Sequence, residues 1–266
     1  MKITFDARTL RDSSGAVGRH YDGPFAEACR LLGGRRRQYH MGLFTGAENL
    51  EAAQAALTEE VARRLPFGAG TELLDIGCGV GGPACQLARD HGWSITGITV
   101  STHQADEARY AVSDLGTGLG RVTVQHADAH FMPFTTSAFD GAYAIESLLH
   151  CTDKERVLAE CRRVLRPGGR VVIWDLIARA DLPADAFPLA NLFGFQDYRD
   201  VCDRNGFEIL LAQDRGEEII PLSLSAFARL LDSEKHRATL HCCHQLARAF
   251  GAGHLGYALF QLEKRP

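Results

Sequence analysis

The sequence predicts an α/β fold of the doubly wound, Rossmann-like type. From residue 71 onward, short runs of aliphatic and β-branched residues alternate with segments of helix-forming composition, which is the rhythm of βαβ units. Residues 72–83 combine a strand, a glycine turn and a helix start in one stretch. We therefore expect a mainly parallel sheet covered by helices on both faces.

The first 68 residues are expected to form an N-terminal segment of helices and loops. Alanines, leucines and charged residues favour a helix at 52–65, and the run from Pro66 to Gly70 closes it.

Seven strands are expected in the rest of the chain, at residues 72–76, 94–100, 121–125, 139–145, 171–174, 207–211 and 257–262. The helices between them are expected at residues 102–115, 152–165 and 197–205. Thr152 and Glu155 match a capping box at the start of one of these helices, and Pro167-Gly168-Gly169 ends it.

The glycine turn after the first strand predicts a site for a nucleotide-like cofactor. Leu73, Leu74 and Ile76 suit a buried strand, and the glycines that follow allow the backbone to pass close to a ligand. Pro83 fits the first turn of the next helix, whose free N–H groups and dipole favour a carboxylate or a phosphate.

The residues around this turn narrow the class of cofactor. Gly77, Gly79 and Gly82 match the dinucleotide fingerprint, which also requires an acidic residue after the second strand. Thr99 stands there instead, which disfavours a nicotinamide or flavin. Asp75 suits a cofactor that carries an ammonium group and a sulfonium.

A helical insertion at residues 223–250 lies between the last two strands. Its expected place over the strand ends predicts a substrate cover. We therefore expect one domain over residues 1–266, in which an N-terminal helical segment (1–68) is followed by a cofactor-binding core (71–222), the cover (223–250) and the last strand (255–264).

Composition favours a small-molecule partner. The 266 residues carry a net charge of -4, which offers no general attraction for nucleic acid. The sequence contains no apolar run long enough for a membrane span, and its first residues lack the apolar core of a secretory signal peptide. A cytoplasmic location is therefore expected. The sequence leaves homo-oligomerisation open.

The cysteines and histidines give no metal or disulfide pattern. The eight cysteines form no CxxC pairs, and we expect them to be reduced. In the run His-Cys-Cys-His at 241–244, only His241 and His244 share a helix face. We therefore interpret this run as part of an ordinary helix surface and expect no metal.

The order of these motifs resembles that of the class I S-adenosylmethionine-dependent methyltransferases. Residues 73–79 are similar to the family's first motif, Asp128-Ala129 to its adenine-binding turn and residues 165–169 to the loop before its fifth strand. Residues 97–104 and 146–150 resemble the branch that methylates sterols, tocopherols, prenyl chains and bacterial natural products.

The chain departs from the family's pattern at one place, and the resemblance also implies a particular sheet. Residues 38–42 are similar to that branch's His-x-Gly-Tyr-Trp segment, but Leu43 and Phe44 replace the aromatic pair. The family implies a seven-stranded twisted sheet whose last strand runs antiparallel, with the cofactor across the carboxyl ends of the first strands.

Carried over residue by residue, the resemblance implies S-adenosyl-L-methionine as cofactor. Gly77 and Gly79 should contact its methionine end, with Asp75 organising the turn and orienting the ammonium group. Asp128 and the N–H of Ala129 should contact the adenine edge.

Further contacts to the cofactor are expected from the second strand and the N-terminus. Thr99, Ser101 and Gln104 should hydrogen-bond the ribose, although Ser101 and Gln104 also match a plain capping box. Tyr21 resembles an early tyrosine that closes over the cofactor, with aromatic core packing as the alternative.

Three residues are candidates for catalysis. His150, just past the fourth strand, is the expected general base for an oxygen acceptor, with capping of the following helix as its alternative role. Asp175, expected at the end of the fifth strand, would orient His150 or take part directly. Glu146 would stabilise cationic character on a carbon acceptor, or else contact the cofactor or a loop.

These residues predict a methyltransferase that acts on a small, largely apolar metabolite. Oxygen or carbon is the expected acceptor atom, with His150 and Asp175 favouring oxygen. The alternative is an enzyme that retains the cofactor but catalyses cyclisation, or couples methylation to ring closure, in a biosynthetic pathway.

Overall fold

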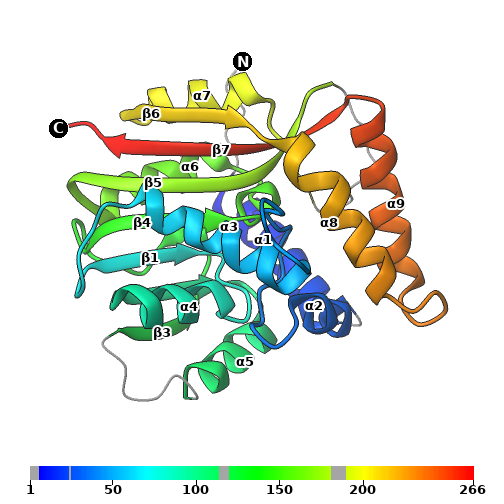
Figure 1. Ribbon diagram of the computed structural model, residues 1–266. Coiled ribbons are helices and arrows are strands. Elements are labelled where there is room, and N and C mark those ends of the chain that lie inside the picture. Colours follow the sequence, from blue (N-terminus) through cyan, green and yellow to red (C-terminus); the bar gives the residue numbers. More distant parts are fainter. Residues whose placement is uncertain (1–5, 24, 114–119, 181–189) are drawn as a thin grey trace.

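A single seven-stranded sheet, in the order β3-β2-β1-β4-β5-β7-β6, forms the centre of the computed structural model (Figure 1). The structure describes residues 6–23, 25–113, 120–180 and 190–266. The strands are β1 Glu72–Ile76, β2 Ser94–Thr99, β3 Arg121–His126, β4 Phe139–Ile145, β5 Leu165–Ala178, β6 Phe207–Asp214 and β7 Leu255–Lys264. β1 to β5 pair in parallel, whereas β7 runs antiparallel to both β5 and β6. The predicted fold class and the direction of the last strand are confirmed.

Helices cover both faces of this sheet. They are α1 Ala7–Asp22, α2 Phe25–Gly33, α3 Leu50–Arg64, α4 Gly82–His91, α5 Thr102–Ser113, α6 Lys154–Val164, α7 Phe195–Arg204, α8 Gly216–Leu230 and α9 Arg237–Gly251, with 3-10 turns η1 Ala129–Phe131 and η2 Leu148–His150. The expected helix at 102–115 is confirmed to Ser113, and its last two positions lie outside the described residues. The helices alternate with the strands as the βαβ rhythm predicted.

The core has two layers because successive side chains of a strand point to opposite faces. On β5, Val172 and Trp174 join the layer that includes α3, α4 and α8, whereas Val171 and Ile173 join the layer that includes α6 and α7. All four side chains are buried. The parallel pairing of β1 with β2 and β4 places the carboxyl ends of these strands at the same edge of the sheet.

The start of α6 differs from the prediction. The N-cap is Asp153, whose carboxylate accepts a hydrogen bond from the N–H of Arg156 at 2.9 Å. The Thr152 hydroxyl is instead hydrogen-bonded to Ser13 on α1. The expected capping box of Thr152 and Glu155 is therefore wrong, because a tertiary contact takes the threonine and aspartate caps a helix equally well.

Two further elements are longer than expected. β5 starts at Leu165 and includes Pro167-Gly168-Gly169, beside a register shift on β4. α8 begins at Gly216 and contains Pro221, so the expected boundary at 223 falls inside a helix. Figure 1 shows α8 and α9 beyond the end of the sheet where β6 ends and β7 begins.

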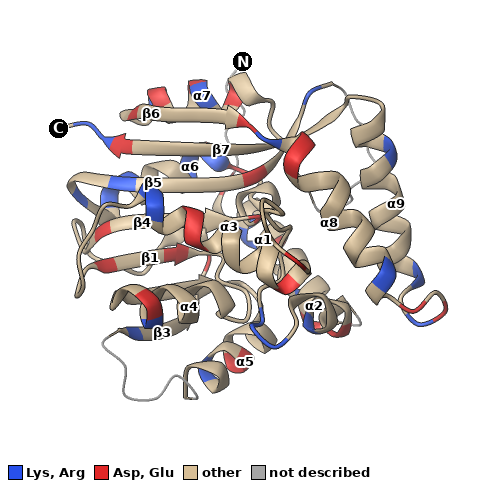
Figure 2. Cartoon of the chain, in the orientation of Figure 1, with Lys and Arg blue, Asp and Glu red and all other residues tan. Residues whose placement is uncertain are grey.

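Charged residues of both signs are interspersed over the helices and strand ends (Figure 2). Within the described ranges, none of the helices has both the length and the hydropathy that a membrane crossing requires. All eight cysteines are free thiols.

Candidate active site

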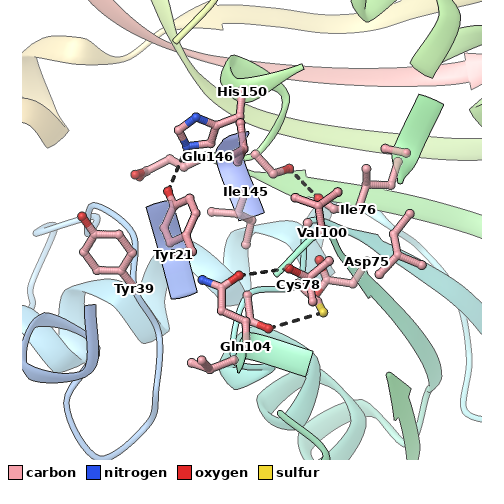
Figure 3. Close-up of a pocket in the computed structure, with 18 of the residues that line it drawn as sticks. Tyr21, Tyr39, Asp75, Ile76, Cys78, Val100, Gln104, Ile145, Glu146 and His150 are labelled. Carbon is pink, nitrogen blue, oxygen red and sulfur yellow. Dashed lines mark hydrogen bonds between the residues drawn. The ribbon is translucent and has the colours of Figure 1, made fainter. Parts of the chain in front are cut away.

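A cavity opens at the carboxyl ends of β1, β2 and β4, where the parallel strands meet the N-terminal helices (Figure 3). This edge is where ligands bind in open α/β sheets, outside the ends of the strands. The glycine turn, the segment after β3, η2 and α1 all line this cavity.

The glycine turn after β1 has the backbone conformation that only glycine adopts freely. Gly77, Gly79 and Gly81 have φ of 81°, 53° and 80°. A Cβ on Gly77 would lie 2.3 Å from the Cβ of Ser147, whereas a Cβ on Gly79 would meet nothing closer than 3.9 Å. The turn therefore packs tightly against Ser147, just after β4, and opens its backbone to the cavity at Gly79.

Asp75 lies beneath this turn and lines the cavity. Its carboxylate accepts a hydrogen bond from the hydroxyl of Tyr143 at 2.9 Å. Burial raises the pKa of Asp75 to about 7, and the bond from Tyr143 acts in the opposite direction. A cationic group in the cavity would stabilise the charged carboxylate.

The residues expected to hold the ribose divide into two sets. Thr99 and Gln104 line the cavity, and the Thr99 hydroxyl donates to the Gln104 carbonyl at 3.0 Å. Ser101 is fully buried: it accepts from the N–H of Gln104 at 2.9 Å and donates to Asp22 at 2.5 Å. Of the two roles considered for Ser101, the structure shows the capping one, and Ser101 does not line the cavity.

Asp128 and Ala129 line the cavity just after β3. The Asp128 Oδ1 accepts from the N–H of His130 at 2.9 Å and bonds its Nδ1 at 2.7 Å. Burial acts to raise the pKa of Asp128, but the bonds from His130 outweigh it and the pKa is lowered. Its Oδ2 is buried and has no hydrogen-bond partner in the described part of the chain. The site thus offers a carboxylate oxygen without a donor.

Tyr21 and His150 contact each other at the cavity wall. The Tyr21 hydroxyl lies 2.9 Å from Nε2 of His150, with the rings edge to face at 5.5 Å between centroids (Figure 3). Both residues line the cavity. Burial raises the pKa of Tyr21, so the phenol keeps its proton.

Glu146, at the end of β4, also lines the cavity. Its backbone has φ 48°, a strained conformation for a residue with a side chain. The carboxylate accepts from the N–H of Met41 at 2.6 Å and from the hydroxyl of Tyr257 at 2.7 Å. Burial raises the pKa of Glu146 to about 7. It thereby joins β4, β7 and the loop after α2 at the cavity wall.

Asp175 lies elsewhere than predicted. Because β5 continues to Ala178, Asp175 is inside the strand and fully buried rather than at its end. Its carboxylate accepts from the Tyr198 hydroxyl at 2.5 Å and from the N–H groups of Leu176 and Leu149. Asp175 does not line the cavity, so the structure places it behind the turn that carries His150.

The N-terminal segment contributes a large part of the cavity lining, which the sequence did not predict beyond Tyr21. These residues are Ser14, Val17, Tyr21, Cys29, Arg37, Tyr39 and His40. The described residues of α8 and α9 do not line the cavity. Instead, α8 supports this segment: Phe227 stacks on Tyr39 at 6.4 Å, and the Ser223 hydroxyl accepts from the N–H of Gly42 at 3.0 Å.

Two lining residues could have been found from neighbouring motifs. Ser147 follows Glu146 directly, and its hydroxyl donates to the carbonyl of Ile76, which ties the segment after β4 to β1. Tyr39 lies in the segment at 38–42 that the sequence marked as family-like. Among the described residues, no three His, Cys, Asp or Glu side chains are grouped as metal ligands.

Fold and site together define an α/β enzyme of the nucleotide-cofactor type, and comparison with known proteins gives its family. A family model described as a methyltransferase domain matches residues 74–173. The O-methyltransferase resE of Aspergillus sclerotiorum is 34% identical over 269 residues, covering 96% of this chain and 99% of that protein. The O-methyltransferase cnsE of Penicillium expansum is 38% identical over 218 residues, covering 77% and 76%.

A solved structure agrees over nearly the whole chain. The [4+2]-cyclase SpnF superposes with a TM-score of 0.82 at 28% identity, covering 95% of this chain and 96% of that one. The chain belongs to the class I S-adenosylmethionine-dependent methyltransferases.

The residues present fit S-adenosyl-L-methionine. The open backbone at Gly79 allows a ligand to approach the turn closely, as shown by the free space where a Cβ would lie. The unpartnered Oδ2 of Asp128 suits an amino or hydroxyl donor, and the buried Asp75 suits a cation. Acceptors for two donor groups thus line one cavity.

Proposed function

We propose that this chain is a cytoplasmic enzyme that transfers a methyl group to a hydroxyl of a small, largely apolar metabolite. The relatives resE and cnsE, which match most of the chain, are named O-methyltransferases. The observation that carries the proposal is the Tyr21–His150 pair at the cavity wall, with 2.9 Å between hydroxyl and Nε2. A hydroxyl acceptor needs a group that takes its proton, and this pair is placed to do so.

Cofactor binding is assigned to one side of the cavity. Gly77 and Gly79 would hold the methionine end, with Asp75 beneath them and Asp128 at the adenine. Thr99 and Gln104 are proposed for the ribose. S-Adenosyl-L-methionine supplies a methyl group on a positively charged sulfur, which is already activated for transfer.

The proton path follows from the Tyr21–His150 contact. As the acceptor oxygen forms its bond to the methyl carbon, its proton passes to the Tyr21 oxygen, and the phenolic proton passes to Nε2 of neutral His150. The products are the methyl ether, S-adenosylhomocysteine and protonated His150, so atoms and charge balance. The apolar walls at Val17, Ile98 and Ile145 exclude water and fix the acceptor, which accounts for much of the rate of such a transfer.

Replacement of His150 tests this assignment. His150→Ala should lower turnover about a hundredfold or more while the dissociation constant for S-adenosylhomocysteine stays unchanged, because the base is lost and the cofactor side is intact. Turnover is measured as S-adenosylhomocysteine release over a panel of phenols and aliphatic alcohols, and binding by calorimetry. His91→Ala, on the far end of α4, is the matched control and should behave as wild type.

Two outcomes would contradict the proposal. If His150→Ala has the turnover of wild type, His150 is not the base. If the folded wild-type protein does not bind S-adenosylhomocysteine, the assignment of the cofactor is wrong.

A second candidate, cyclisation with retained cofactor, is favoured by the likeness to the cyclase SpnF. Mass spectrometry separates the two functions. Methyl transfer adds the mass of one methylene to the product, whereas cyclisation alone adds none.

A further inference from the structure

Lys154, at the start of α6, is a buried cation outside the cavity lining. The residue is 1% exposed, although lysine is almost never fully buried unless it is paired. Its Nζ donates to the carbonyl of Cys151 at 3.3 Å and to the carbonyl of Asn191, and it lies 4.5 Å from the ring centroid of Phe193. The ammonium therefore joins the end of η2 to the segment that leads into α7.

Asp175 is the charged group that accompanies Lys154. Burial lowers the pKa of Lys154 and raises that of Asp175 to about 7, and the attraction between the two opposes both shifts. Asp175 also accepts a hydrogen bond from the N–H of Leu149, the residue before His150. The carboxyl group of Asp175 thus binds the backbone on one side of His150, and the amino group of Lys154 binds it on the other side, at Cys151.

Asn191 completes the support of this turn. Its N–H donates to the carbonyl of Leu149 at 2.6 Å, and its side-chain amide donates to the carbonyls of Cys151 and Thr152 at 3.2 and 2.9 Å. Because Lys154 in turn donates to the carbonyl of Asn191, it holds the turn and its support together.

The turn needs such support because it is short. η2 is a three-residue 3-10 turn without a capping hydrogen bond from the side chain of its N-cap Ser147, whose hydroxyl donates to the carbonyl of Ile76 instead. A single 3-10 turn has poor hydrogen-bond geometry and does not fix a side chain by itself. Catalytic side chains must be held within about 0.5 Å of their productive position, which requires supporting residues of this kind.

We propose that Lys154 is a positioning residue for His150: together with Asp175 and Asn191 it clamps the backbone on both sides of that histidine. The inference rests on the proposed function, because it gives Lys154 an effect on turnover through His150. It also gives Asp175 a role as anchor of the turn rather than as direct partner of the base.

Lys154→Met tests the clamp, since methionine is an unbranched side chain only one atom shorter than lysine and carries no charge. We expect kcat to fall about tenfold or more, as for a displaced catalytic group, while the dissociation constant for S-adenosylhomocysteine is unchanged. Lys264→Met is the matched control: its Nζ also donates to a backbone carbonyl, that of Leu165, but on the edge of the sheet away from the cavity. It should retain the wild-type kcat.

The double variant Lys154→Met/His150→Ala shows whether Lys154 acts through His150. If it does, the double variant has the kcat of His150→Ala alone, because the clamp has nothing left to position. A further tenfold loss in the double variant would overturn the inference, and so would a folded Lys154→Met with wild-type kcat.

Asn191→Ala provides a second route if Lys154→Met does not fold. It removes only an exposed side-chain amide from the same turn, and kcat should again fall with binding unchanged. Wild-type kcat in Asn191→Ala would then overturn the inference. The proposed function fails separately: it is refuted by wild-type kcat in His150→Ala, whereas a low kcat there beside a wild-type kcat in Lys154→Met refutes the clamp alone.

Discussion

Gly77 combines a left-handed backbone with a direct steric contact. Its φ is 81°, and a Cβ would lie 2.3 Å from that of Ser147. Gly70 has the same φ of 81° but nothing within 4 Å of its Cβ position. Comparison of the two positions therefore separates the free-energy cost of a left-handed backbone from the cost of a steric contact.

Gly70→Ala should lower the free energy of unfolding by about 1 kcal/mol, the usual cost of a side chain in this conformation. Gly77→Ala should lower it further and weaken S-adenosylhomocysteine binding at least tenfold, because the turn must move away from Ser147. Thermal unfolding and calorimetry measure the two effects. Equal behaviour of the two variants would show that the contact with Ser147 does not shape the turn.

At the scale of elements, α1 is held on the cavity by its last residue and by one close approach. Asp22 accepts hydrogen bonds from Ser101 at 2.5 Å and from the N–H of His103 at 3.1 Å, at the start of α5. A Cβ on Gly18 would lie 2.5 Å from the carbonyl oxygen of Val100. Tyr21 directly precedes Asp22. The packing of α1 against α5 therefore determines the position of the Tyr21 hydroxyl in the cavity.

Asp22→Ala should therefore weaken S-adenosylhomocysteine binding severalfold and lower the free energy of unfolding by about 1 kcal/mol. Asp6→Ala is the control, because Asp6 caps the other end of the same helix, away from the cavity. It should lower stability by a similar amount and leave binding unchanged. Denaturant unfolding with parallel calorimetry distinguishes the two, and equal binding by both variants would contradict the docking role.

The sequence predicted those parts of the site whose signal is local. Gly77, Gly79 and Asp75 lie within five residues of one another, so strand, turn and helix start could be recognised together. Ser101 and Asp175 could not be placed, because their partners Asp22 and Tyr198 come from distant parts of the chain. The same holds for the N-terminal lining of the cavity, since which helix covers a sheet edge depends on tertiary packing.

At the scale of the molecule, three buried carboxyl groups lie at or behind the strand ends. Burial raises the pKa of Asp75, Glu146 and Asp175 to about 7 each. Between about pH 4 and pH 7 the folded protein retains protons on these groups that the unfolded chain has released. The free energy of unfolding must therefore fall as pH rises through this window.

Two histidines act in the opposite direction. Burial lowers the pKa of His40 to about 4 and also lowers that of His20, so the unfolded chain binds their protons first. Because the three carboxyl groups outnumber the two histidines, their effect on stability should prevail. We expect a net loss of stability between pH 5.5 and pH 8 in the ligand-free protein. The thermal midpoint should fall by several degrees, measured by scanning at fixed ionic strength.

Asp75→Asn isolates one of these groups. The amide cannot ionise, so the variant should be more stable than wild type at pH 8, and its thermal midpoint should change less between pH 5.5 and pH 8. It should also bind S-adenosylhomocysteine more weakly, because the charged carboxylate that suits the ligand's ammonium group is absent. Asp90→Asn, at the exposed end of α4, is the control for removal of a charge. A variant Asp75→Asn with the pH dependence of wild type would show that the buried carboxyl does not carry its proton near neutral pH.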